Sequence, residues 1–225
     1  FNHRFAQPSA QSNPSFGHNF PFVDNMRYDP VSGARDGLLK RIRELSGAPK
    51  IFYTNSSNEY WRGDGSLVHI DPADGTDVEP ARESRIYHFA GTQHGAGSLP
   101  QGTLSPFDGS RGRYPFNGVD YRPLLRAVLL NLDAWVTDGT EPPPSVHPRI
   151  SDGTAVTQRD LLRPFRSVPG LEQPDLDRLW KLRLPSHPLC DESCQGLVFQ
   201  QETLPAEDEE PSDAWGALED WKQQK

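Results

Sequence analysis

The chain has 225 residues, 34% of them hydrophobic and 10% aromatic, which suffices for one sizeable domain with a modest core. Its formal net charge is −8, and no run of Lys or Arg is interleaved with aromatic residues, which argues against nucleic acid as a partner. No apolar stretch approaches the roughly 20 residues of a membrane helix, and two cysteines are too few for a disulfide framework.

The N-terminal residues predict an irregular segment. The chain starts at Phe1 rather than Met, and the next residues lack the charged start and apolar run of a signal peptide. We therefore expect the true N-terminus to lie upstream, and any targeting signal with it. Residues 1–35 contain four prolines among Ser, Asn and Gly, a composition typical of a long ordered loop.

Two elements are predicted between residues 36 and 58. Apolar residues recur at helical spacing from Leu38 to Leu45, and Gly47 follows the last of them, so a helix is expected here. Residues 50–54 (KIFYT) form a short apolar run bounded by the polar residues 55–58, typical of a buried parallel strand. Residues 67–70 fit either a short helix or a short strand.

A second strand and a long helix are predicted downstream. Residues 85–90 (RIYHFA) indicate a strand, and residues 91–95 (GTQHG) form the loop at its C-terminal end, where α/β sheets place their chemistry. The helix should run from Asp120 to Val136, with Pro123 in its first turn and Gly139 after its last. Its apolar stripe consists of Leu124, Leu125, Val128, Leu129, Leu132 and Trp135.

The C-terminal third has weaker patterns. Prolines 142–144 end the helix and favour an extended segment to about residue 148. Residues 200–225 are acidic, rich in Gln and poor in aliphatic residues, so we expect them to be poorly ordered. The predicted division is therefore an α/β domain over residues 1–155 and an irregular, proline-rich and acidic extension over residues 156–225.

Glu59 and His94 are the candidate chemical groups. Each follows the end of a predicted strand, and adjacent parallel strands bring such positions to one edge of a sheet. In a hydrolytic triad a histidine takes the proton of a serine, and a carboxylate orients that histidine. The 35-residue separation permits this pairing but does not prove it.

Longer stretches around these residues resemble a known family. The segments IFYTNSSNEYW (51–61) and RIYHFAGTQHG (85–95) are similar to the bacterial α/β-hydrolase domain proteins, as are FNHRFAQP (1–8) and LDAWVTDG (132–139). The resemblance covers roughly residues 1–155. Residues beyond about 170 depart from the family pattern.

The resemblance implies an α/β fold: a truncated α/β-hydrolase sheet with flanking helices, followed by the irregular extension. It implies hydrolysis of a small-molecule carboxylic ester without a cofactor, with His94 as general base and acid and Glu59 as its orienting carboxylate. The family's nucleophilic serine lies on a Gly-x-Ser-x-Gly elbow, and this sequence contains no such motif. We therefore expect the serine and part of the oxyanion hole upstream, so that this chain alone is inactive. The alternative function is a non-catalytic binding or scaffolding module with a hydrolase-like fold.

Several other residues compete for a role. Asp64, beside a glycine turn, is the alternative acid. Ser56 and Ser57 precede the acid, which is the wrong order for a nucleophile, so hydrogen bonds that shape the acid loop are expected of them. Tyr60 and Trp61 are candidates for substrate binding, although core packing is the more common role of such residues.

We expect no metal site. His187, Cys190 and Cys194 are the nearest approach to a zinc cluster, but they supply only three ligands, and Cys-x-x-x-Cys is not the usual spacing. Alternation along the second strand makes His88 a hydrogen-bonded core histidine by default.

Overall fold

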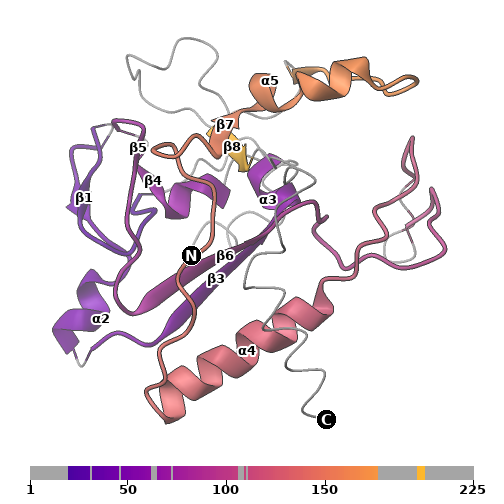
Figure 1. Ribbon diagram of the computed structural model, residues 1–225. Helices are drawn as coiled ribbons and strands as arrows, with labels where there is room; N and C mark the ends of the chain where they lie inside the picture. The colour runs from indigo at the N-terminus through magenta and orange to yellow at the C-terminus, as the bar shows by residue number, and fades with distance from the viewer. Residues whose placement is uncertain are drawn as a thin grey trace.

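The computed structural model describes residues 20–176 without 31, 46, 62–64, 72, 106–108 and 110, and the backbone of 197–200. Within these residues the chain has an α/β fold in which short sheets are flanked by helices (Figure 1). The strands are β1 (Arg27–Tyr28), β2 (Arg35–Asp36), β3 (Ile51–Ser56), β4 (Ile70–Asp71), β5 (Thr76–Asp77), β6 (Ser84–Phe89), β7 (Ala155–Thr157) and β8 (Leu197–Gln200). The helices are α2 (Lys40–Leu45), α3 (Ser57–Trp61), α4 (Arg122–Thr137) and α5 (Gln158–Leu161), with 3₁₀ turns η1 (Gly65–Val68) and η2 (Pro164–Ser167).

The central element is the parallel pair of β3 and β6. Their register runs from Ile51 opposite Ser84 to Ser56 opposite Phe89, so both strands end at the same edge. On the other side of β6, the segment after α4 forms a parallel bridge at Val146, whose amide donates to the Ile86 carbonyl at 2.8 Å. The two predicted strands are thus confirmed as a parallel pair, and the extended segment after α4 is a third neighbour that the sequence does not predict.

The two faces of β3 bind different parts of the chain, as alternation along a strand requires. On one face, the Phe52 ring lies 5.2 Å from Tyr87 and 5.8 Å from Trp135 of α4, between ring centroids. On the other, the Tyr53 hydroxyl donates to Asp24 at 2.6 Å. The Asp24 side chain also accepts from the Ser84 hydroxyl at 2.5 Å, which ties the segment before β1 to both strands.

Helix α4 forms where the sequence predicts it, but its apolar stripe is mostly uncovered. Trp135 is buried among the described residues and lies beneath the Lys50 ammonium and the Arg85 guanidinium. By contrast, Leu124 and Leu129 expose 43% and 64% of their surface. Figure 1 shows α4 running alongside the β3–β6 pair. Among the described residues, the C-terminal end of α4 is therefore the part packed against the strands.

A second layer packs on α3. Tyr60 is fully buried, and Val156 of β7 and Leu161 of α5 pack against it. The Gln158 side chain donates to the Trp61 carbonyl at 3.2 Å. These contacts join the region after residue 155 to the helix that carries Glu59.

Residues 67–70, for which the sequence leaves helix and strand open, include the end of η1 and the start of β4. No helix among the described residues is long and apolar enough to cross a membrane. The predictions for residues 1–19 and 201–225 concern parts of the chain outside the described residues.

Candidate active site

The site lies where β3 and β6 end. Helix α3 starts directly after β3 and carries Glu59 in its first turn. The loop after β6 carries His94. The Ser57 hydroxyl accepts from the Gly91 amide at 2.9 Å, so the two segments are linked where they leave the strands. The parallel register therefore brings together two residues that are 35 positions apart in the sequence.

Glu59 and His94 are in direct contact. The His94 Nδ1 atom lies 2.5 Å from Glu59 Oε1. An ionised carboxylate can only accept hydrogen bonds, so Nδ1 carries the proton and donates it. The Glu59 side chain is 7% exposed, whereas that of His94 is 64% exposed. A buried acid thus holds one nitrogen of an open imidazole and leaves Nε2 on the solvent side, with no hydrogen bond from the described residues.

The carboxylate of Glu59 is kept ionised by its partners. Burial by itself would raise its pKa, but hydrogen bonds from the Ser56 hydroxyl, from His94 and from the Ser56 amide outweigh burial and lower the pKa below its ordinary value. The Ser56 amide donates to Oε2 at 2.7 Å, and the Ser56 hydroxyl donates to the same oxygen. Ser56 therefore positions the acid, in line with the hydrogen-bonding role expected for Ser56 and Ser57.

The backbone of His94 is also fixed. The Tyr121 hydroxyl donates to the His94 carbonyl at 2.6 Å, and the Tyr121 ring stacks on Phe89 at the end of β6. Tyr121 is 8% exposed and immediately precedes α4. The sequence gives no sign of this contact, because the intervening loop has no periodic pattern.

The model of the alpha/beta hydrolase domain family matches residues 22–177, which is more than half of the chain. The chain belongs to this alpha/beta hydrolase family. No curated protein and no solved structure matched the chain.

The two residues predicted to contact substrate, Tyr60 and Trp61, follow Glu59 on α3. Tyr60 is 0% exposed, and its hydroxyl lies 2.9 Å from His69 Nε2. Trp61 is partly buried against Tyr60. The structure thus places Tyr60 in the core, where its ring has no solvent-facing surface to offer a substrate.

Two buried histidines, His69 and His88, lie against Tyr60, and a third, His147, lies against His69. The His69 ring lies 4.4 Å from that of His147, and the Tyr60 ring lies 4.6 Å from that of His88. Burial and the neighbouring His147 lower the pKa of His69 to about 3, and burial also lowers the pKa of His147. Both imidazoles are therefore neutral at pH 7. No group of His, Cys, Asp and Glu in the described part of the chain has a geometry that could hold a metal ion.

The alternative acid and the candidate zinc ligands lie outside the residues that the structure describes. Asp64, the alternative acid, lies in the gap at 62–64, and His187, Cys190 and Cys194 lie between the two described ranges. Of the two candidate acids, Glu59 is the one that the structure describes, and it contacts His94.

Proposed function

We propose that this chain supplies the acid and the histidine of a serine hydrolase that acts on carboxylic esters. The observation that carries the proposal is the hydrogen bond of 2.5 Å between His94 Nδ1 and the buried Glu59 carboxylate. It lies at the carboxyl edge of a parallel strand pair, in a chain of the alpha/beta hydrolase family.

This arrangement suits a histidine that moves protons. With Nδ1 held by Glu59, Nε2 is the basic nitrogen, and it takes the proton as a serine oxygen bonds to the ester carbonyl carbon. The imidazolium then returns that proton to the leaving alkoxide as the carbon–oxygen bond breaks. Water repeats the sequence on the acyl-enzyme. Glu59 stays ionised throughout and stabilises the cation.

The nucleophilic serine would then belong to a segment outside these 225 residues. Family members place it on a Gly-x-Ser-x-Gly elbow, and the residue after it contributes one amide of the oxyanion hole. The chain contains no such motif. We refer to this chain together with the serine-bearing segment as the complete domain.

Replacing His94 tests the proposal. In the complete domain, we expect His94→Ala to lower kcat for p-nitrophenyl acetate by about 10⁴-fold or more, because the triad acts as a unit. His94 is a mostly exposed side chain, so the circular dichroism spectrum and the melting temperature should change little. Near-normal turnover by the folded variant would refute the role of His94.

A further inference from the structure

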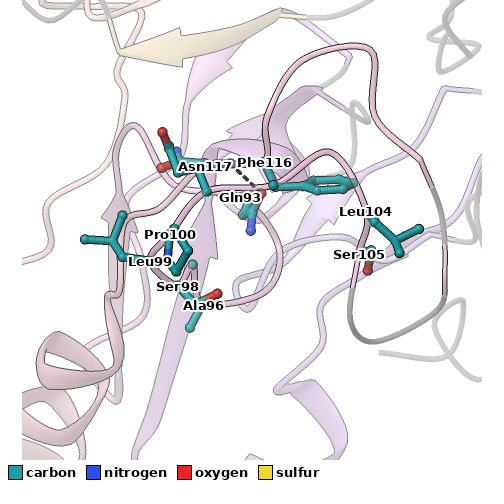
Figure 2. A pocket seen from close by; sticks show the side chains of 12 residues that line it. Gln93, Ala96, Ser98, Leu99, Pro100, Leu104, Ser105, Phe116 and Asn117 are labelled. Carbon is teal, nitrogen blue, oxygen red and sulfur yellow. Dashed lines mark hydrogen bonds between the residues drawn. The ribbon is translucent and has the colours of Figure 1, made fainter.

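A pocket opens in the loop that follows His94. The loop leaves β6, passes through residues 96–105 and returns at Phe116 and Asn117, and the pocket lies between the outgoing and returning arms (Figure 2). Its volume is about 320 Å³. This lies at the lower end of the range of ligand sites, about 300–1,000 Å³.

Backbone contacts hold the two arms at a fixed spacing. The Gly97 amide donates to the Val119 carbonyl at 2.8 Å, and the Phe116 amide donates to the Gly102 carbonyl at 2.8 Å. The Asn117 amide donates to the Gln93 side-chain oxygen at 3.2 Å, the contact drawn in Figure 2. At Gly97 the arms are so close that an added Cβ would lie 2.4 Å from the Asn117 oxygen. The pocket is therefore formed before a ligand arrives.

The lining of the pocket is uncharged. Amide and hydroxyl groups alternate with apolar surface, and no charged side chain is present among the described residues that line it. A charged ligand group would meet no counter-ion among these side chains. An uncharged group with some apolar surface and a hydrogen-bonding atom matches this lining. Its polar members include Gln93, Ser98 and Asn117, and its apolar members include Leu99, Leu104 and Phe116.

The pocket lies close to His94 along the chain. Gln93 lines the pocket and directly precedes His94, so their Cα atoms are about 3.8 Å apart. The histidine of a triad protonates the leaving oxygen, so the alcohol side of the ester lies next to the histidine. We propose that this pocket binds the alcohol portion of the ester and selects for an uncharged one. The inference rests on the proposed function, since that function makes His94 the proton donor.

Binding to the 225-residue chain tests the inference without requiring hydrolysis. The probes are 3,3-dimethylbutyl acetate, which is neutral, and acetylcholine, which has the same shape with a cationic nitrogen. The anionic 4-acetoxybutanoate is the third. Amide shifts in ¹H–¹⁵N spectra of the labelled chain report on each titration. We expect the neutral ester to shift Gly97, Leu99 and Asn117, with at least tenfold higher affinity than either charged ester.

Two variants locate the binding. Ala96→Phe and Ser98→Phe each add a ring to the lining and should abolish the shifts. Ala34→Phe makes the matched substitution at an exposed position between β1 and β2 and should leave binding unchanged. Ser98 is exposed, so its variant should fold even if Ala96→Phe does not.

Three results would overturn the inference: equal affinity for the charged esters, no saturable shifts with the neutral ester, or unchanged binding in a folded variant with a filled pocket. These outcomes differ from failure of the proposed function. An inactive complete domain whose pocket still selects the neutral ester would defeat only the proposed hydrolysis.

Discussion

The side chains of Glu59 and His94 differ sharply in their exposure to solvent. The Glu59 side chain is buried beneath His94, whereas most of the His94 side chain is exposed to solvent. A base must meet its substrate, but its orienting acid need not. The lowered pKa of Glu59 fits this role, because a protonated carboxyl would lose its charge-assisted contact with the imidazole.

Replacing each candidate acid in turn by its neutral amide discriminates between Glu59 and Asp64. In the complete domain, we expect Glu59→Gln to lower kcat by several orders of magnitude, about 10⁴-fold, because the neutral amide neither stabilises the imidazolium nor fixes the tautomer. Asp64→Asn should lower kcat far less, because only the carboxylate that orients the imidazole fixes its tautomer. Steady-state kinetics with p-nitrophenyl acetate measure both variants. The opposite ranking would assign the acid to Asp64.

The sequence predicts this pair because both residues follow strands of similar apolar composition, and parallel strands end at one edge. For Tyr60 it leaves two roles open, substrate binding and the more common core packing. Its neighbours Glu59 and Trp61 suggest a site, but the single turn of α3 directs the Tyr60 ring into the core against His69. Side-chain direction in one helical turn depends on tertiary packing, which the short segment does not encode.

Among the elements, the loop between β6 and α4 has the most direct effect on the site. It carries His94 at its start and ends at Tyr121, whose hydroxyl donates back to the His94 carbonyl. This hydrogen bond joins the two ends of the loop and thereby helps to fix the position of the His94 backbone relative to the end of β6. Its irregular sequence has no period from which such a contact could be predicted.

Removing that hydroxyl tests its positioning role. We expect Tyr121→Phe to lower kcat in the complete domain by roughly fivefold, with KM little changed, because the ring stays stacked on Phe89 while one hydrogen bond worth about 1 kcal/mol is lost. Tyr114→Phe is the matched control, since that hydroxyl contacts Gly170 at 3.1 Å, away from His94. Equal kinetics for the Tyr121 variant and the wild type would contradict the assignment.

Helix α4 marks a limit of sequence patterns. The position of the helix follows from its 3.6-residue period and its flanking Pro123 and Gly139, but a period says nothing about what covers an apolar stripe. The described residues cover mainly the Trp135 end. On β3, likewise, the edge away from β6 carries no strand in the described part of the chain.

Across the whole molecule, the buried histidines couple stability to pH. The pKa of His69 is about 3 in the folded chain, against an ordinary value of 6.5. Between these values the unfolded state binds a proton that the folded state does not. The free energy of unfolding therefore falls as the pH falls, by up to about 1.4 kcal/mol per pH unit for one histidine. His147, whose pKa is also lowered, acts with the same sign.

Replacing His69 should reduce this pH dependence. We expect His69→Phe to lower stability at pH 7, because the Tyr60 hydroxyl loses its partner, and to flatten the loss of stability between pH 6.5 and 5. Urea unfolding at several pH values measures both effects. This window lies above the ordinary pKa of Glu59, whose own contribution is lost only at lower pH. Leu67→Ala, a buried substitution without a titrating group, should lower stability equally at every pH, and an unchanged slope in His69→Phe would contradict the account.

The most direct test of the central claim is labelling by a fluorophosphonate probe, which needs a serine activated by a base beside oxyanion donors. Residues 1–225 alone should not be labelled, since they hold the acid and the base without a nucleophile elbow. The complete domain should be labelled at one serine of the added segment, and His94→Ala should abolish that labelling. Stoichiometric labelling mapped by mass spectrometry to a serine of this chain, such as Ser56 or Ser57, would contradict the claim that the nucleophile lies outside it.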